Sequence, residues 1–386
     1  MYADYQTVML CIIAAMTLIA IVNLALIPSL RRSGLPEERP RVSILVPVRN
    51  EEAAIEECLR RLTDQDYPDY EVVVLDDSSE DATFERASRV ARENRRLRVV
   101  RGKSLPAGWT GKGYACHQLS EMAEGELFLF TDADTLHSPH SVSAAVAALQ
   151  NQRAGLLTAI PRQIMITFWE KMFLPMLHFV TWCYLPLPLV RLSRNPKFAM
   201  ANGQYMLFRR DTYRAIGGHA SVRSALVEDV WLSRRVKQWG YRLAIVDGGD
   251  AVACRMYRNF REIWEGFSKN LFPGFRYSVP AITMVVVFNS LTSVLPFVTL
   301  AGAFAARSHS GPWLSLAAAQ AALIIAVRLL MSRRFRMEYW PAILHPAAMT
   351  LLIAIAFNSC RWVLFAGGAR WKGRRYDFHK QPLAQE

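Results

Sequence analysis

The sequence lacks the patterns that mark several common protein classes. Its six cysteines are scattered and form no C-x-x-C pair, so we interpret them as buried free thiols in a reducing compartment. No nucleic-acid motif or base-stacking pattern accompanies the net charge of +13, which argues against a nucleic-acid partner. The chain also contains no short-period repeat and no low-complexity tract.

Acidic residues are fewer than basic ones, 33 against 46, and many basic residues gather beside apolar stretches. These basic clusters are Arg31-Arg32, Arg333 to Arg336 and Arg370 to Arg375. Such clusters suit anionic lipid head groups. The hydrophobic fraction of 52% is high for a soluble enzyme, and the excess lies at the two ends of the chain. We therefore expect membrane segments rather than a larger core.

The first apolar run, from Thr7 to Leu30, is long enough to cross a bilayer, which takes about 20 residues. It has no basic segment before it and exceeds the apolar region of a usual signal peptide, so we interpret residues 1–32 as a retained transmembrane anchor. Asp4 is the only charge before the run, whereas four arginines follow it: Arg31, Arg32, Arg39 and Arg41. The positive-inside rule therefore places the following domain in the cytoplasm. We expect a multi-pass protein of the cell (inner) membrane.

Three further apolar segments, residues 279–306, 313–331 and 340–365, are separated by short loops. We expect them to form one transmembrane bundle over residues 279–365. Four spans from an external N-terminus leave the C-terminus outside, but the basic tail at residues 366–386 favours the inside. One segment would then be re-entrant or interfacial, and the sequence does not say which.

Residues 164–192 are also apolar, but charged residues and three prolines interrupt them. We interpret this stretch as an interfacial helical segment rather than a span. A single crossing here would place Asp229 on the opposite side of the membrane from Asp134, so one site would not contain both.

Residues 41–275 alternate between strand and helix patterns. We expect strands at residues 42–46, 71–75, 97–100, 126–130 and 155–160, and helices at residues 51–62, 83–94, 112–123 and about 139–150. This alternation predicts an α/β domain, Rossmann-like, with a mostly parallel sheet covered on both faces.

Asp132 and Asp134 follow the buried strand at residues 126–130. Open α/β sheets bind ligands beyond the carboxyl ends of their strands. Two hard oxygen ligands suit a divalent cation that carries a diphosphate. A D-A-D triplet is common by chance, and its position at a strand end favours the metal hypothesis. His137 and His140 have H-x-x-H spacing, but Pro139 and the loop context argue against a histidine metal site.

Other candidate residues have ordinary structural explanations as well. Asp76-Asp77 closes a strand and is suited to bind a base or ribose, or else caps the next helix together with Ser78-Ser79. Residues 48–51 open a helix, whose N–H groups suit a nucleotide or phosphate, while Asn50 is equally an N-cap. Lys112 could neutralise the charge of a phosphate, or it is a lysine exposed to solvent.

Glu228-Asp229 begins a predicted helix at residues 230–239. Acidic residues favour a helix N-terminus through the helix dipole, which is a complete structural explanation. The functional alternative is a general base that deprotonates an acceptor hydroxyl.

Together these residues resemble the family 2 glycosyltransferases of GT-A fold, over about residues 41–275. The matching pieces fall in the expected order: Pro47 to Glu51, Val74 to Ser78, Gly111-Lys112, Thr131 to Asp134 and Val227 to Asp229. The ordered set is more specific than any single motif.

The resemblance implies a role for each matched position. Asp77 would contact the uracil, Asp134 with Asp132 would hold Mn²⁺ or Mg²⁺ on the diphosphate, and Asp229, beside Glu228, would be the catalytic base. The remaining nucleotide-sugar-binding residues would be Pro47, Arg49, Glu51, Asp76 and Lys112. One base opposite the leaving group, without a second nucleophilic carboxylate, implies inversion at the anomeric carbon.

One motif of the processive members, Q-x-x-R-W, is missing after the base, which argues against a polysaccharide synthase. Several pieces look more like the bacterial carotenoid-ester (diaponeurosporenoate) glycosyltransferases, and residues 371–376 resemble the end of ceramide glucosyltransferase-like enzymes. Those pieces add four acceptor or diphosphate candidates: Gln204, His219, Arg255 and Lys269.

The resemblance therefore predicts non-processive transfer of a sugar from a nucleotide sugar, expected to be a UDP-sugar, to a membrane lipid of carotenoid, terpenoid or sphingolipid type. The alternatives are a processive polysaccharide synthase and a non-catalytic membrane scaffold with a vestigial nucleotide site.

Overall fold

The computed structural model describes residues 2–31, 36–307, 311–365, 369–371 and 374–376. Within them the chain forms two compact units. One comprises the described residues among 2–26, 165–186 and 257–376, and the other the described residues among 27–164 and 187–256. We call them the helical unit and the α/β unit. Arg32 and most of the basic tail predicted at residues 366–386 lie outside the described residues.

A seven-stranded sheet forms the centre of the α/β unit, in the order β3-β2-β1-β4-β8-β6-β9. Neighbours β3, β2, β1 and β4 run parallel, β8 is antiparallel to both β4 and β6, and β9 is parallel to β6. The strands are β3 (Leu97–Arg101), β2 (Tyr70–Asp76), β1 (Val42–Val48), β4 (Leu127–Thr131), β8 (Tyr205–Arg209), β6 (Leu156–Ile160) and β9 (Leu243–Asp247). The predicted, mostly parallel α/β sheet is confirmed.

A smaller three-stranded sheet lies in the same unit. It comprises β5 (Thr135–His137), β10 (Val252–Cys254) and β7 (Arg162–Gln163), in the order β5-β10-β7. Because β5 starts directly after Asp134, this sheet holds the chain that leaves β4. The Arg255 N–H donates to the Asp134 carbonyl at 3.2 Å and extends that connection beyond β10.

The helices of the α/β unit follow from the spacing of their apolar residues. In α2, Ile55, Cys58, Leu59 and Leu62 repeat every three to four residues and are all buried. The helices are α2 (Ile55–Leu62), α3 (Thr83–Glu93), α4 (Gly111–Met122), α5 (Ser141–Asn151), α8 (Pro188–Leu192), α9 (Arg210–Ala215) and α10 (Glu228–Gln238), with short 3₁₀ turns η1 (Pro196–Phe198) and η2 (His219–Val222).

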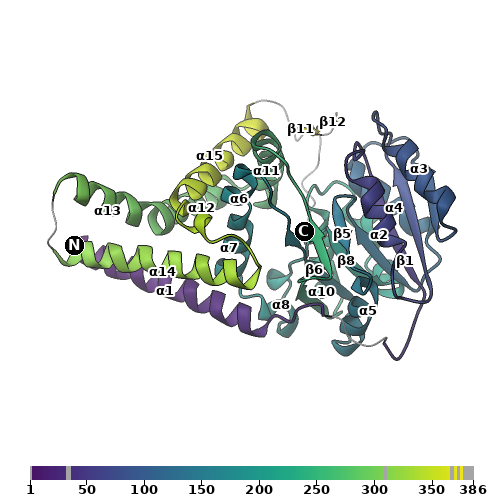
Figure 1. Cartoon of the computed structure of the whole chain (residues 1–386), viewed down its shortest axis with the longest axis horizontal. Coiled ribbons are helices and arrows are strands. Elements are labelled where there is room, and N and C mark those ends of the chain that lie inside the picture. The colour runs from purple at the N-terminus through teal and green to yellow at the C-terminus, as the bar shows by residue number, and fades with distance from the viewer. Residues whose placement is uncertain (1, 32–35, 308–310, 366–368, 372–373, 377–386) are drawn as a thin grey trace. The chain divides into compact units, whose positions relative to one another are not determined.

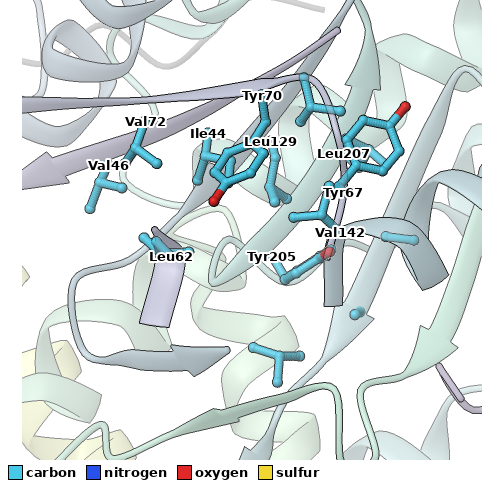
Figure 2. Packing of buried hydrophobic residues seen from close by; sticks show 14 of the residues in the cluster. Ile44, Val46, Leu62, Tyr67, Tyr70, Val72, Leu129, Val142, Tyr205 and Leu207 are labelled. Atoms are coloured by element: carbon cyan, nitrogen blue, oxygen red, sulfur yellow. The ribbon is translucent and has the colours of Figure 1, made fainter. Parts of the chain in front are cut away.

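Figure 2 shows the core of this unit. Ile44 and Val72 come from the adjacent strands β1 and β2, Leu129 from β4, and Leu62 from α2. All four are fully buried. Burial of each such side chain favours folding by about 1.5–3 kcal/mol, so these strands are held firmly and their carboxyl ends have fixed positions.

The helical unit contains four helices that are long and apolar enough to cross a membrane: Asp4–Leu26, Val279–Ala305, Pro312–Arg334 and His345–Leu364. One is near the N-terminus and three follow the α/β unit, as the sequence predicts. Helix α1 (Tyr2–Leu26) packs along α14 (Pro312–Arg334), as Figure 1 shows. The Gln320 amide donates to the carbonyl and side-chain oxygens of Gln6 between them, at 2.8 and 2.7 Å.

The second apolar helix is not continuous. It consists of α12 (Val279–Asn289), a π-helical turn η3 (Ser290–Val294) and α13 (Leu295–Ala305). A π-helical turn interrupts the regular hydrogen-bond ladder of an α-helix. The other elements of the unit are α6 (Phe168–Phe173), α7 (Pro175–Tyr184), α11 (Phe260–Gly274), η4 (Trp340–Ala342), α15 (His345–Leu364), β11 (Ala369–Trp371) and β12 (Arg374–Tyr376).

The apolar stretch at residues 164–192 folds into three short helices, α6, α7 and α8. The longest, α7, has 10 residues. Such a helix is about 15 Å long, half of the hydrocarbon thickness of a bilayer. None of the three is long enough to be a span, and their interfacial position stays a prediction.

Candidate active site

Three pairs of acidic residues, which we call the first, second and third acidic patches, are Asp76-Asp77, Asp132 with Asp134, and Glu228-Asp229. The first two patches lie at one edge of the sheet. Strands β2 and β4 both pair in parallel with β1, so their carboxyl ends point the same way. Asp76 and Asp77 end β2, and Asp132 follows β4. Two strand spacings separate them, about 10 Å. Strand β8 is antiparallel to β4 and pairs Tyr205 with Thr131, so the chain enters β8 at this same edge.

Lys112 connects the second and third acidic patches. It lies in the first turn of α4, and its Nζ is 2.7 Å from Asp132 Oδ1 and 3.3 Å from Glu228 Oε1. Although desolvation opposes its charge, Asp132 and then Glu228 raise the pKa of Lys112 well above its ordinary value. The lysine therefore stays cationic and holds the two carboxylates together, although they are far apart in sequence.

Asp229 lies beside Glu228 at the start of α10. Its Oδ2 accepts from the Gly203 N–H at 2.9 Å and its Oδ1 from the Val230 N–H at 2.8 Å. Burial and then the negative charge of Glu228 raise the pKa of Asp229 to about 6, against the opposing effects of Lys112 and the two N–H groups. A carboxylate with this pKa is ionised at neutral pH and is more basic than an ordinary aspartate, which suits a general base.

Gly203 belongs to the site and is absent from the sequence-based candidates. A β-carbon on it would lie 3.3 Å from both Asp229 Oδ2 and Lys112 Nζ. The close approach of this backbone to both charged groups therefore favours glycine. The only available signal was the sequence Ala201 to Gln204, which enters the family resemblance without an assigned role for the glycine.

A buried thiol shows that charges from all three acidic patches share one neighbourhood. Burial raises the pKa of Cys116; Lys112 lowers it, while Glu228, Asp132 and Asp77 raise it further. The structure thus brings these groups around one side chain of α4. Asp76 lies deeper: it is 1% exposed, its Oδ2 accepts from the Ser79 N–H at 3.2 Å, and its Oδ1 is buried without a hydrogen-bond partner.

The residues around Asp134 fit a divalent cation. Burial raises the pKa of the neighbouring thiols of Cys58 and Cys254, and the negative charges of Asp134 and Asp132 raise it further. The surroundings of Asp134 are thus negative, which favours a bound cation. The described residues contain no group of three or more side chains that could hold a metal alone. Two carboxylates fit an ion whose other ligands are water and diphosphate oxygens, as is usual for Mg²⁺.

The phosphate site that we expected at the helix start near residue 51 is not formed. Helix α2 begins at Ile55, not at Glu51. The N–H groups of Asn50, Glu51 and Glu52 donate to the side chains of Ser79, Thr83 and Asp81 at 3.0, 2.7 and 3.2 Å. Because the β2–α3 loop occupies these donors, they do not bind phosphate in this arrangement. Nor is Asn50 the N-cap of α2, because that position is Ala54.

Arg49 ties the same two loops together. Its guanidinium donates to the carbonyls of Asp77 and Ser78 at 2.7 and 2.6 Å and pairs with Glu80 at 2.9 Å. It therefore fixes the backbone that presents Asp77. The cap of α3 comes from Asp81, whose Oδ1 accepts from the Thr83 N–H at 3.0 Å, so Asp77 is not needed for that purpose.

The four acceptor or diphosphate candidates have different environments. Gln204 and His219 are 5% and 0% exposed. The Gln204 amide donates to Cys254 Sγ at 2.8 Å, and His219 Nδ1 bonds the Tyr213 hydroxyl at 2.7 Å. Arg255 is partly exposed and bonds Asp134 through its backbone. Lys269 lies on α11 of the helical unit. Their roles toward an acceptor or diphosphate stay predictions.

Comparison with known proteins places this site in a family. The family model "Glycosyl transferase family 2" matches residues 43–217, which contain the first two acidic patches, Lys112 and Gly203. The 4,4'-diaponeurosporenoate glycosyltransferase of Staphylococcus haemolyticus (strain JCSC1435) is 24% identical over 351 residues, which are 90% of this chain and 91% of that protein. The protein of the same name from Staphylococcus aureus (strain USA300) is 27% identical over 356 residues, 88% of this chain and 89% of that protein.

Among solved structures, the mannosyltransferase PcManGT from Pyrobaculum calidifontis, in complex with GDP-Man and Mn²⁺, has a TM-score of 0.60 and 21% identity. The similarity covers 94% of this chain and 99% of that one and shows that the two share a fold. Residues 43–217 therefore form a glycosyl transferase family 2 domain of GT-A fold, and the chain is a glycosyltransferase.

Proposed function

We propose that the chain transfers a single sugar from a nucleotide sugar to a membrane lipid, with inversion at the anomeric carbon and without polymerisation. The observation that carries this proposal is the arrangement of Asp132, Lys112, Glu228 and Asp229, with Asp229 held by Gly203 at the carboxyl edge of the sheet. It supplies a place for a diphosphate and a base with a raised pKa.

The donor side uses the ends of β2 and β4. Asp77 binds the base of a nucleotide that we propose to be UDP, and Asp132 and Asp134 hold Mn²⁺ or Mg²⁺. The solved mannosyltransferase, a complex with GDP-Man and Mn²⁺, supports a divalent ion and makes a guanine nucleotide the first alternative to test. When bound, the ion acts as a Lewis acid that offsets the negative charge of the leaving diphosphate.

The acceptor side uses Asp229. It takes the proton of the acceptor hydroxyl as the acceptor oxygen bonds to the anomeric carbon. The bond from that carbon to the diphosphate breaks, and its electron pair leaves with the diphosphate. Attack opposite the leaving group inverts the configuration. If the acceptor group is a carboxyl, the buried, negative surroundings that raise the pKa of Asp229 would raise its pKa as well. A base would then help to remove its proton.

The acceptor is a lipid on this proposal, and the reaction takes place at the cytoplasmic surface. Four apolar helices support membrane attachment. The arginines after the first apolar run support a cytoplasmic α/β unit. The name 4,4'-diaponeurosporenoate glycosyltransferase, carried by the two staphylococcal relatives, supports a carotenoid- or terpenoid-like acceptor rather than a growing polysaccharide.

The proposal is tested with inverted membrane vesicles from cells that produce the full chain. The vesicles receive radiolabelled UDP-glucose, UDP-N-acetylglucosamine or GDP-mannose with Mn²⁺, and label is counted in the organic extract and in retained polymer. We expect one donor to label the organic extract with one sugar per lipid, in the inverted anomeric configuration. Label in polymer, or retention of configuration, would contradict the proposal.

Two variants assign the roles. We expect Asp229→Asn to lose transfer but keep nucleotide binding, and Asp134→Ala to lose metal-dependent donor hydrolysis and transfer. Asp64→Asn is the matched control, because Asp64 is an exposed aspartate that follows α2 and takes no part in the site. Wild-type turnover by either site variant would refute the role assigned to that residue.

A further inference from the structure

Lys237 is a buried lysine for which the proposed reaction has no use. It lies near the C-terminal end of α10 and is 4% exposed. Its Nζ donates to three backbone carbonyls, those of Leu189, Ser193 and Phe198, at 3.2, 2.9 and 3.1 Å. An ammonium group has three donors, so this lysine uses all of them on one segment of backbone.

The segment that Lys237 holds, residues 188–198, has little structure of its own. Helix α8 has five residues and the 3₁₀ turn η1 has three. Backbone carbonyls at the ends of such short elements favour a nearby cation, and the Leu189 carbonyl also accepts from the Ser193 N–H at 3.0 Å. Within the described residues no carboxylate pairs with Lys237, so the carbonyl dipoles alone compensate its charge.

The position of this segment in the chain connects it to the site. It is where the chain returns to the α/β unit after residues 165–186, which belong to the helical unit. Five residues after Phe198 the chain reaches Gly203, whose N–H donates to Asp229. Asn202 is also fixed, because its N–H donates to Thr158 Oγ1 at 2.8 Å.

Helix α10 therefore contacts the returning chain at two points, at Gly203 and at residues 188–198. Near its start, Asp229 accepts from Gly203; eight residues later, about 12 Å along the helix, Lys237 binds the three carbonyls. The helix that carries the base and the backbone that holds the base are joined twice. Loss of the Lys237 connection leaves the Gly203 contact and the Asn202–Thr158 hydrogen bond to hold this backbone.

We propose that Lys237 is a positioning residue for transfer: it fastens residues 188–198 to α10 so that the Gly203 N–H remains on the Asp229 carboxylate. This inference rests on the proposed function only in taking Asp229 as the base. Lys237 does not contact the reacting groups, so it acts on the rate of the chemical step and leaves donor binding at Asp77, Asp132 and Lys112 unchanged.

The test compares Lys237→Met, which removes the ammonium at similar length, with Lys237→Arg, which keeps a cation with several donors. The assay uses vesicles with the full chain and the donor that labels lipid with the wild type, and measures kcat and donor KM. We expect Lys237→Met to lower kcat roughly 10-fold with donor KM within about 2-fold, because small displacements of a catalytic group are costly. Lys237→Arg should recover most of the rate. Lys197→Met, an exposed lysine of the same segment, is the control.

A double-mutant cycle shows whether Lys237 acts through Gly203. If it does, Gly203→Ala together with Lys237→Met should lower kcat little more than the stronger single variant, because both disturb the same contact. The inference would be overturned if the double variant lowered kcat by the product of the two single effects, or if Lys237→Met had a wild-type kcat. It would also be overturned if Lys237→Met lost kcat and nucleotide affinity equally and Lys237→Arg recovered neither.

A variant that fails to fold does not end the test. If Lys237→Met does not accumulate, Lys237→Gln keeps two donors and should give an intermediate kcat at unchanged donor KM; an unchanged kcat would again overturn the inference. The two proposals can fail separately. Turnover by Asp229→Asn would refute the base, whereas an inactive Asp229→Asn with a fully active Lys237→Met would refute only the positioning role.

Discussion

Replacement of Glu228 by glutamine should shift the pH dependence of transfer toward acid. Burial and the charge of Glu228 raise the pKa of Asp229 from 3.8 to about 6. Burial is the larger of these two raising effects and the charge of Glu228 the smaller. Glutamine has nearly the same shape without the charge, so it removes the repulsion that disfavours the Asp229 carboxylate.

The sign follows from which form is active. A base acts when it is ionised, so turnover rises with pH through the pKa of Asp229, with a midpoint at about 6 in the wild type. Without the Glu228 charge the ionised form persists to lower pH, and the midpoint should fall by an amount on the order of one pH unit. The weaker base should also lower the plateau about 3-fold.

The assay is kcat/KM for transfer between about pH 4.5 and 8, because kcat/KM reports the pKa of the enzyme before the donor binds. Glu85→Gln is the control, because Glu85 is an exposed glutamate in the first turn of α3, as Glu228 is in the first turn of α10. Its profile should match that of the wild type. An unchanged or upward-shifted midpoint in Glu228→Gln would refute the electrostatic role of Glu228.

Three other substitutions test the rest of the site. Gly203→Ala places a β-carbon 3.3 Å from both Asp229 Oδ2 and Lys112 Nζ and should lower kcat roughly 10-fold with little change in Tm; a wild-type kcat would show that this approach is unimportant. Lys112→Met leaves the buried Glu228 and Asp132 without their cation and should lower kcat/KM for the donor roughly 10- to 100-fold; an unchanged donor KM and kcat would contradict its role. In Asp134→Ala, added Mn²⁺ should no longer stimulate nucleotide release, whereas it should restore the rate of chelator-treated wild type; equal stimulation of both would place the metal elsewhere.

The strands nearest the site are predictable from sequence for a physical reason. Strands β1, β2 and β4 each contain a run of four or more apolar residues, Ile44 to Val48, Val72 to Leu75 and Leu127 to Phe130, as expected for strands buried on both faces. A carboxylate directly after such a run must lie at the carboxyl edge of the sheet. The positions of Asp76, Asp77 and Asp132 therefore follow from local pattern alone.

The contacts between distant segments are not predictable in this way. Strand β8 enters antiparallel between β4 and β6, and this insertion brings Gly203 to Asp229. Lys112 was expected to neutralise a phosphate or remain solvated, but it pairs with Asp132 and Glu228, one of them more than one hundred residues away. Helix α2 was expected from residue 51 but begins at Ile55, after a turn in which the Ala54 and Ile55 N–H groups donate to the Glu51 carbonyl.

Mass spectrometry of extracted lipids tests the central claim most directly. Cells that carry the gene, cells that lack it and cells with Asp229→Asn are compared. We expect one lipid species that is heavier than its precursor by a single sugar residue, present only with the wild-type gene, and its precursor should accumulate in the other two strains. Identical lipid profiles in all three strains, or a long polymer in place of a glycosylated lipid, would contradict lipid glycosylation by this chain.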